Sequence, residues 1–220
     1  MRSLLLSLPR LGTVLTPPFA SDLNELLPLH TGSVQIVVKK IALVTGANKG
    51  IGFEVSKQLA ELGYRVVLGC RNRQLGEEAT ERLRTNGLTD TAFSLVDVTD
   101  IGTITSTRGF IESRFGVLDV LVNNAGILGT VPQPALSYPV DEIRRIFDTN
   151  FFGAIQVAQE FIPLLQKSEA GRIANVTSGL GSLTLHGDPT WKYYAVKSAG
   201  YAVSKTALNG FTVMLALSLH

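Results

Sequence analysis

The sequence predicts an α/β fold in which a doubly wound parallel sheet, truncated after about five strands, is covered by helices on both faces. Two observations support this prediction. Short apolar segments alternate along the chain with longer segments that have helical spacing, which is the pattern of strands joined by right-handed crossovers. The apolar segments also lack polar alternation, so both faces of each strand are expected to be buried.

The predicted strands are short apolar runs. Residues 41–44 read Ile-Ala-Leu-Val and end in glycine-rich sequence, which is typical of a buried strand. The next run, residues 65–69, is of the same kind and follows the turn residue Gly63. The five predicted strands are residues 41–44, 65–69, 91–95, 118–122 and 172–176.

The predicted helices occupy the intervals between the strands. Gly63 and Gly87 lie at the ends of the first two, where glycine commonly closes a helix. Asp100 is a candidate N-cap for the third, because its side chain can accept a backbone N–H. The fourth is long and carries Ile143, Ile146 and further apolar residues at helical spacing. The five predicted helices are residues 51–62, 75–85, 101–115, 141–165 and 202–217.

The composition indicates one folded domain with an N-terminal extension. The chain has 220 residues, of which 45% are hydrophobic, enough for a core and too few residues for two full domains. Residues 39–220 form the predicted domain. Residues 1–38 have neither helical nor strand periodicity and are interpreted as a disordered extension or as sequence upstream of the natural start. A transit peptide and a secretory signal remain alternatives, although Pro9 and Arg10 interrupt the apolar stretch that a signal requires.

The net charge, the lengths of the apolar runs, and the few cysteine and histidine residues argue against nucleic-acid-binding, membrane-spanning and metal-binding proteins. The formal net charge is +2, so we expect no nucleic-acid partner. No apolar run reaches the roughly 18–20 residues that a membrane span needs, so we expect no membrane partner. Cys70 is the single cysteine, and His30, His186 and His220 are scattered. We therefore expect no disulfide within the chain and no bound metal, and a cytoplasmic location fits this cysteine usage, with organellar transit as the alternative.

A glycine-rich segment joins the first predicted strand to the first predicted helix. It carries glycines at positions 46, 50 and 52, and a strand before and a helix after it are the context that a dinucleotide-binding loop requires. Gly46 permits the tight turn, and Gly50 lets the backbone approach a pyrophosphate at the helix N-terminus. Gly52 permits close packing of helix and strand.

The end of the second predicted strand indicates which dinucleotide is bound. An NAD-binding protein usually has Asp or Glu there to hold the ribose 2′-hydroxyl, whereas this chain has Arg71. Lys49, in the glycine-rich loop, adds a second cation. Two cations without a carboxylate favour a 2′-phosphate, so NADP(H) is the predicted cofactor.

Residues 39–220 resemble the short-chain dehydrogenases/reductases, a family with a Rossmann fold, and within it the NADPH-dependent carbonyl reductase branch. The glycine spacing matches the family's Thr-Gly-x-x-x-Gly-x-Gly motif, and residues 123–126 match its Asn-Asn-Ala-Gly motif. Asn150, Ser178 and the pair Tyr201 and Lys205 match the family's catalytic positions. The residues that the loop and the resemblance together assign to the cofactor are Gly46, Asn48, Lys49, Gly50, Ile51, Gly52, Arg71, Asp97, Val98, Asn124, Ala125, Gly126, Tyr201 and Lys205.

The chemistry of Tyr201 and Lys205 agrees with the resemblance. Residues four apart share one helix face, and an ammonium group beside a phenol stabilises the phenolate. Tyr201 is therefore the predicted proton donor to a carbonyl oxygen, and Ser178 can hydrogen-bond the same oxygen. The resemblance further implies that Lys205 holds the nicotinamide ribose and that Asn150 anchors a water leading to Lys205.

Other residues compete for these roles. Tyr193 and Lys197 have the same spacing as the predicted pair, but Gly200 would interrupt a helix that began there. Thr177 is a second candidate for the serine position and is expected instead to support the end of the strand. Residues 183–200 are longer than the corresponding segment of most family members, and we interpret them as a loop near the substrate mouth. In the carbonyl reductase branch such an insertion accompanies a monomeric state, which we expect here too.

Two functions remain open at this point. The family sheet has seven strands and we count five, so the last predicted strand should be an exposed edge and the nicotinamide end should be open to water. The first function is an NADPH-dependent oxidoreductase that reduces a ketone or aldehyde, its small-molecule partner, to an alcohol. The alternative is a non-catalytic NADP-binding remnant or fragment of a reductase.

Overall fold

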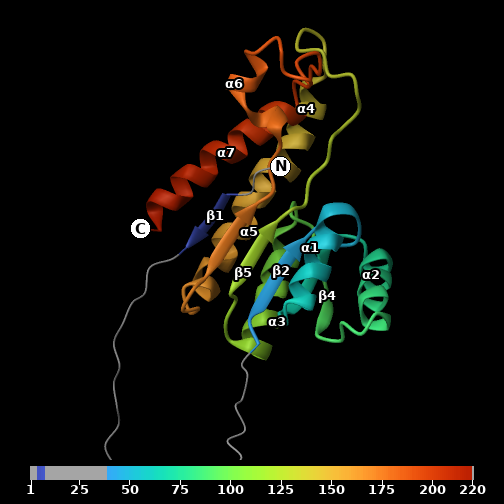
Figure 1. The fold of residues 1–220 in the computed structure, drawn as a ribbon, viewed down its shortest axis with the longest axis vertical. Helices are drawn as coiled ribbons and strands as arrows, with labels where there is room; N and C mark the ends of the chain where they lie inside the picture. The colour runs from blue at the N-terminus through green and yellow to red at the C-terminus, as the bar shows by residue number, and fades with distance from the viewer. Residues whose placement is uncertain (1–3, 8–38, 220) are drawn as a thin grey trace, which may run out of the picture.

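In the computed structural model, residues 4–7 and 39–219 are described, and they form one twisted sheet with helices on both faces (Figure 1). The strands are β1 (Leu4–Ser7), β2 (Ile41–Thr45), β3 (Arg65–Cys70), β4 (Thr91–Leu95), β5 (Val120–Asn123) and β6 (Arg172–Asn175). The helices are α1 (Gly50–Glu61), α2 (Arg73–Thr85), α3 (Ile101–Phe115), α4 (Val140–Phe147), α5 (Gly153–Leu165), α6 (Leu183–His186) and α7 (Tyr201–Ser218). The predicted doubly wound parallel sheet is confirmed.

Strands β2 to β6 are parallel, and the full sheet has the order β1-β6-β5-β2-β3-β4. Alternate residues of a strand point to opposite faces, and both faces are apolar here. Ile41 and Leu43 pack into the core that includes Val157 and Phe161 of α5. Ala42 and Val44, the alternate residues of the same strand, pack into the core beneath α1 and α2. This two-sided burial is the reason that the strands lack polar alternation.

The edge of the sheet beside β6 differs from the prediction. We expected the fifth parallel strand to be exposed, but β1 pairs with it antiparallel, with Leu4 opposite Asn175 and Ser7 opposite Arg172. An edge strand presents a row of unpaired N–H and C=O groups that another segment can satisfy. The sequence did not predict this strand. The rest of the predicted extension, residues 1–3 and 8–38, lies outside the described residues.

The long helix predicted over residues 141–165 is divided into three parts. Between α4 and α5 lies a π-helical turn, η1 (Asp148–Phe152). Such a turn widens the helix by one residue and often occurs at functional sites. Asn150 lies in the middle of this turn and is fully buried, so the turn carries a predicted site residue.

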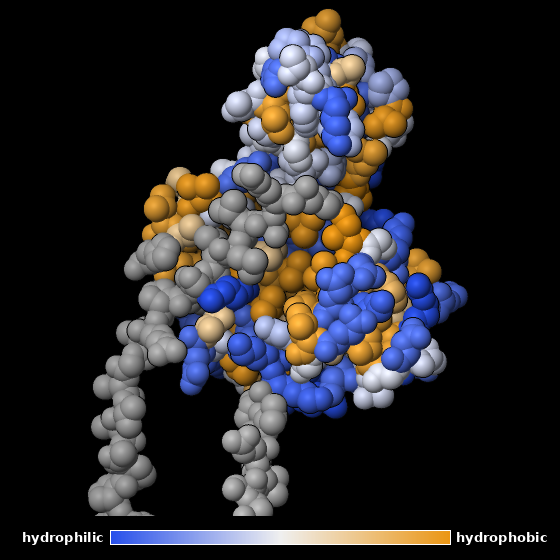
Figure 2. All heavy atoms as spheres, in the orientation of Figure 1, coloured by the Kyte–Doolittle hydropathy of each residue, from blue (hydrophilic) through white to orange (hydrophobic). Residues whose placement is uncertain are grey.

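The remaining segments form a lobe above the carboxyl edge of the sheet. Figure 1 shows α6 and the loop before α4 in this lobe, close to the start of α7. A 3-10 turn, η2 (Gly179–Gly181), links β6 to α6. Figure 2 shows apolar side chains gathered in the recess between the lobe and the body of the sheet. Within the described ranges, no helix combines the length and apolarity that crossing a membrane requires.

Candidate active site

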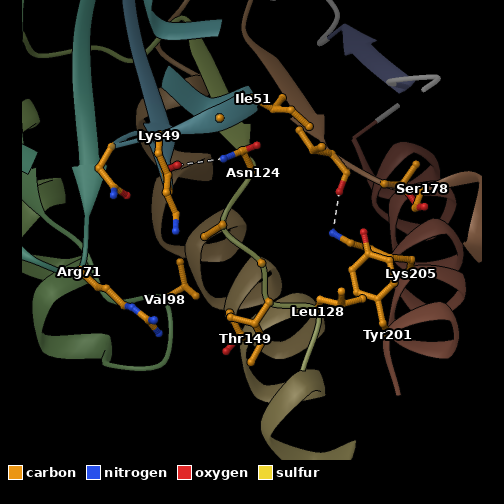
Figure 3. A pocket seen from close by; sticks show the side chains of 18 of the residues that line it. Lys49, Ile51, Arg71, Val98, Asn124, Leu128, Thr149, Ser178, Tyr201 and Lys205 are labelled. Carbon is orange, nitrogen blue, oxygen red and sulfur yellow. Dashed lines mark hydrogen bonds between the residues drawn. The ribbon is translucent and has the colours of Figure 1, made fainter. Parts of the chain in front are cut away.

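A cleft of about 670 Å³ lies at the carboxyl ends of the parallel strands, which is where open α/β sheets bind their ligands. Figure 3 shows Lys49 and Arg71 at one end of the cleft and Ser178, Tyr201 and Lys205 at the other. Fourteen of the predicted site residues line it: Gly46, Asn48, Lys49, Gly50, Ile51, Arg71, Asp97, Val98, Asn124, Ala125, Gly126, Ser178, Tyr201 and Lys205. Gly52 and Asn150 are buried behind its wall.

The glycine loop is held in place by hydrogen bonds from the end of β5. The side-chain amide of Asn124 donates to the carbonyl oxygens of Thr45 (2.9 Å) and Gly46 (3.1 Å). The Thr45 hydroxyl accepts the backbone N–H groups of Asn124 and Ala125, each at 3.0 Å. Gly46 has a φ of 64°, a left-handed conformation that favours glycine. These contacts fix the loop before any ligand binds.

The N-terminus of α1 opens onto the same cleft. Lys49 is its N-cap, and no side chain caps the helix there. The first N–H groups of a helix have no partner within the helix, and together with its dipole they favour an anion. The loop and this helix end therefore form a site that fits a phosphate group.

Gly52 shows how closely the loop and the helix approach each other. A Cβ atom at this position would lie 2.5 Å from the carbonyl oxygen of Gly46 and would also overlap the side-chain amide of Asn124. We expect Gly52→Ala to displace the loop and to raise the dissociation constant of NADPH at least tenfold, measured by fluorescence titration. Gly210→Ala is the matched control, because a Cβ at this helical position meets nothing within 4 Å. Equal affinities of the two variants would contradict this role for Gly52.

The end of the cleft next to β3 is cationic. Lys49 and Arg71 are exposed, and within the described part of the chain neither forms an ion pair. Asp97 also lines the cleft, but its carboxylate accepts from the backbone N–H and the hydroxyl of Thr99 (2.9 and 2.7 Å). The carboxylate is therefore held by the turn that follows β4, next to the buried Val98.

At the other end of the cleft, Lys205 lies beside Tyr201 one turn further along α7. Its Nζ is 6.0 Å from the centre of the Tyr201 ring and donates to the carbonyl oxygen of Val176 (2.8 Å). Lys205 is only 4% exposed, and this burial lowers its pKa to about 8. The predicted pair thus shares the cleft with Ser178.

Ser178 and Thr177 differ in how their hydroxyl groups are used. The Ser178 Oγ accepts the backbone N–H of Leu180 at 3.2 Å, so its own proton is free to turn toward a ligand in the cleft. The Thr177 hydroxyl donates to the Asn209 Oδ1 at 2.6 Å and thereby ties the end of β6 to α7. This geometry suits Ser178 better than Thr177 for the role of hydrogen-bond donor to a substrate.

The burial of Lys205 predicts how stability depends on pH. In the unfolded chain this amine keeps its proton up to its ordinary pKa of 10.5, whereas in the folded chain it releases the proton near pH 8. Between these two values the unfolded state binds more protons, so the free energy of unfolding should rise with pH. Urea unfolding from about pH 7.5 to about pH 9 measures this rise.

Lys205→Met is the control for this prediction, because it removes the titrating group. A control is needed because Cys70 also titrates: burial raises the pKa of its thiol to about 11. Above about pH 9 this thiol lowers the free energy of unfolding and so opposes the increase due to Lys205. The wild-type chain should gain stability relative to Lys205→Met as the pH increases. Parallel pH profiles for the two proteins would refute the assignment.

Asn150 lies behind the cleft wall and connects three segments by side-chain hydrogen bonds. Its Oδ1 accepts the backbone N–H of Ile127 (2.7 Å), and its Nδ2 donates to the carbonyl oxygen of Ile127 (2.9 Å) and to the Ser204 hydroxyl (3.0 Å). These bonds join η1, the loop after β5 and α7. The structure therefore gives Asn150 a bracing position, and its water-anchoring role stays a prediction.

The competing pair Tyr193 and Lys197 lies outside the residues that line the cleft. Both are exposed in a stretch of turns before α7 rather than on a helix. Lys197 instead donates to the carbonyl oxygen of Tyr194 and lies over its ring, 4.2 Å from the ring centre. The two residues of this pair are therefore not brought together with Ser178.

The segment over residues 183–200 lies beside the end of the cleft that Ser178 and Tyr201 line. The His186 Nε2 is 2.8 Å from the carbonyl oxygen of Leu180, a residue of the cleft wall. Trp191 packs edge-on against His186 and against Tyr193, with ring centres 5.3 and 5.5 Å apart. His186 is thus engaged in holding the segment.

Sequence reasoning missed part of the cleft wall. The lining residues that the sequence analysis did not single out are Val96, Thr99, Ile127, Leu128, Thr149, Val176 and Leu180. Ile127 and Leu128 directly follow the Asn-Asn-Ala-Gly motif, so their position in the chain was an available signal. Thr149 projects from the π-helical turn, which no sequence pattern indicated. Among the described residues, no group of three or more potential metal ligands is present.

Comparison with known proteins agrees with this geometry. The family model for short chain dehydrogenases matches residues 40–220. A short-chain dehydrogenase of Penicillium roqueforti, anuI, is 36% identical over 84% of this chain and 74% of its own length. Carbonyl reductase [NADPH] 1 of Macaca fascicularis is 39% identical over 63% of this chain and 49% of its own length. The matches therefore span between about half and three quarters of the length of these curated relatives.

A solved structure is also similar to this one. The salutaridine reductase of Papaver somniferum superposes with a TM-score of 0.72 and 32% sequence identity. The match covers 82% of this chain and 83% of that one. The two chains therefore share their fold over most of their lengths.

Proposed function

This chain belongs to the short-chain dehydrogenase family, and on that premise we propose that it reduces a ketone or an aldehyde to the corresponding alcohol with NADPH. One observation carries the proposal. Ser178, Tyr201 and Lys205 converge at one end of a cleft whose other end holds the glycine loop and two cations, Lys49 and Arg71. Reductases among the relatives, which include salutaridine reductase and carbonyl reductase [NADPH] 1, support the direction of the reaction.

The residues present fit a dinucleotide. The loop leaves no room for side chains at Gly46 and Gly52, where a Cβ would overlap the backbone of the neighbouring strand or loop. A Cβ at Gly126 would lie 3.2 Å from the Asn150 Oδ1 and 3.6 Å from the Lys205 Nζ. The backbone itself thus forms the wall of the cleft, as close contact with a cofactor requires.

The choice of NADPH rests on the ribose end of the cleft. Arg71 follows β3, and Lys49 stands in the loop above it. A guanidinium group binds a phosphate through paired hydrogen bonds that a ribose hydroxyl cannot match. The end of β3 carries no carboxylate that would accept the 2′-hydroxyl of NADH.

The proposed chemistry divides the reduction between cofactor and protein. When bound, the cofactor supplies the hydride for the carbonyl carbon. Tyr201 donates its phenolic proton to the carbonyl oxygen, and Ser178 donates a hydrogen bond to that oxygen as negative charge develops on it. Lys205, held by Val176, presents a positive charge that stabilises the phenolate left on Tyr201.

The proposal is tested with the purified chain, NADPH and a panel of aldehydes and ketones, by following the absorbance of the reduced nicotinamide. Turnover that needs both NADPH and a carbonyl compound supports a reductase. Tight NADPH binding without turnover on the whole panel would favour the alternative, a non-catalytic NADP-binding remnant. Failure to bind NADPH would refute both functions.

A further inference from the structure

Gln133, in the loop between β5 and α4, makes an unusual set of contacts for a loop residue. Its side chain is fully buried. The Oε1 atom accepts hydrogen bonds from the Ser198 hydroxyl (2.9 Å) and from the backbone N–H groups of Gly200 (3.1 Å) and Tyr201 (3.0 Å). The Nε2 atom donates to the carbonyl oxygen of Leu128 (2.7 Å). One amide group therefore connects the start of α7 with the wall of the cleft.

The start of α7 needs this contact. Its N-cap, Gly200, has no side chain with which to accept the N–H groups of the first turn. Unsatisfied N–H groups at a buried helix end are costly, and a side-chain acceptor at an N-terminus stabilises the helix. Gln133 supplies that acceptor from 68 residues away. It thus holds the backbone of the residue whose side chain is the proposed proton donor.

The surroundings leave Gln133 little freedom to move. A Cβ at Gly200 would lie 2.7 Å from the Ile146 Cδ1 and 3.3 Å from the Gln133 Oε1. Ile146 is fully buried and Tyr138 is 9% exposed. The backbone also pairs, because the carbonyl oxygen of Gln133 accepts the N–H of Ala199 at 3.1 Å. The amide is therefore a rigid link rather than an incidental surface contact.

We propose that Gln133 is a positioning residue that sets the orientation of Tyr201 relative to Leu128 and Lys205 in the cleft. The inference rests on the proposed function, since Tyr201 must be the proton donor for its orientation to affect turnover. A displacement of about 1 Å of a reacting group can lower a rate about a hundredfold. Gln133 touches the cleft wall through backbone groups, the carbonyl oxygen of Leu128 and the N–H of Tyr201, and does not line the cleft itself, so cofactor binding should not depend on it.

The test is a double-mutant cycle with Gln133→Met and Tyr201→Phe in the whole chain, measuring kcat with a reducible aldehyde and the dissociation constant of NADPH. Gln133→Met should lower kcat about 10- to 100-fold and change NADPH binding less than about twofold. In the Tyr201→Phe background the same substitution should lower kcat no further, because the group that it positions is already absent. An equal loss in both backgrounds would overturn the proposal.

Thr212→Val is the matched control for loss of a buried polar contact on the same helix. Thr212 is 5% exposed, accepts from the Asn175 side chain at 2.9 Å and lies away from the cleft. Its substitution should lower the Tm about as much as Gln133→Met and leave kcat unchanged. If both variants lose activity in proportion to their Tm, the role of Gln133 is structural only and the proposal fails.

Two further outcomes separate this inference from the proposed function. Full activity of Tyr201→Phe would refute the proposed role of Tyr201, whatever Gln133→Met does. If Gln133→Met does not fold, Ser198→Ala removes only one of the three donors to Oε1. It should lower kcat about threefold in the wild-type background and not in the Tyr201→Phe background, and an equal loss in both would refute the positioning role.

Discussion

Tyr201→Phe is expected to lower kcat for carbonyl reduction by about 10²–10⁴-fold, the range that general acid catalysis contributes. The substitution removes one oxygen and keeps the ring, which lies with its centre 6.0 Å from the Lys205 Nζ. The position of Lys205 should be preserved, because its Nζ is held by the carbonyl oxygen of Val176. The dissociation constant of NADPH should therefore change little. Stopped-flow or steady-state oxidation of NADPH measures the first quantity, and fluorescence titration the second.

The same substitution at Tyr193 is the control for this experiment. Tyr193 begins the other Tyr-x-x-x-Lys segment and is exposed outside the cleft, so Tyr193→Phe should keep its turnover. A loss of turnover in Tyr193→Phe together with an active Tyr201→Phe would assign the chemistry to the competing pair. A wild-type chain that binds NADPH but is inactive on every carbonyl compound would leave only the binding function.

Arg71→Ala is expected to weaken NADPH binding about 10- to 150-fold, which corresponds to roughly 1.5–3 kcal/mol for a hydrogen-bonded charge pair. Arg71 is exposed at the end of β3 and lines the cleft, so its guanidinium group is available to a 2′-phosphate. NADH has no such phosphate, and its affinity should be nearly unchanged. Isothermal titration of both cofactors measures the two losses.

Arg73→Ala controls for the change in net charge. Arg73 is two residues away and exposed, but it pairs with Glu77 at 3.3 Å rather than lining the cleft. Arg73→Ala should weaken the binding of NADPH and of NADH slightly and to the same extent. Added salt should make both losses smaller, because it screens exposed charges. Equal losses for NADPH and NADH in Arg71→Ala would refute the assignment of Arg71 to the 2′-phosphate.

Local patterns predicted the regular part of the fold. The third predicted strand and the third predicted helix, β4 and α3 in the structure, have the predicted bounds. Asp100 caps α3 by accepting a 2.9 Å hydrogen bond from the N–H of Gly102. The other predicted strands and helices begin or end within a few residues of the observed ones. These elements were predictable because apolar spacing and capping residues act over a few neighbouring positions.

The irregular parts of the site were not predictable in this way. The π-helical turn at Asn150 follows no local signal, because the residues around it have ordinary helical spacing. The pairing of β1 with β6 depends on an edge that is formed only after the sheet has assembled. The contact between Gln133 and Tyr201 joins a loop to the start of α7, and no motif connects the two. The last two features are contacts between residues distant in the chain.

The sequence by itself determined the alternation of strands and helices, the glycine loop and the one-turn spacing of Tyr201 and Lys205, because each depends on backbone preferences or side chains within a few residues. Only the tertiary structure decided how deeply Lys205 is buried and what holds the first turn of α7, and it placed in the cleft the Tyr-x-x-x-Lys pattern that the sequence favoured. Those properties depend on which surfaces meet when the sheet and helices pack. Burial and hydrogen bonding between distant segments are therefore what distinguish the two tyrosines.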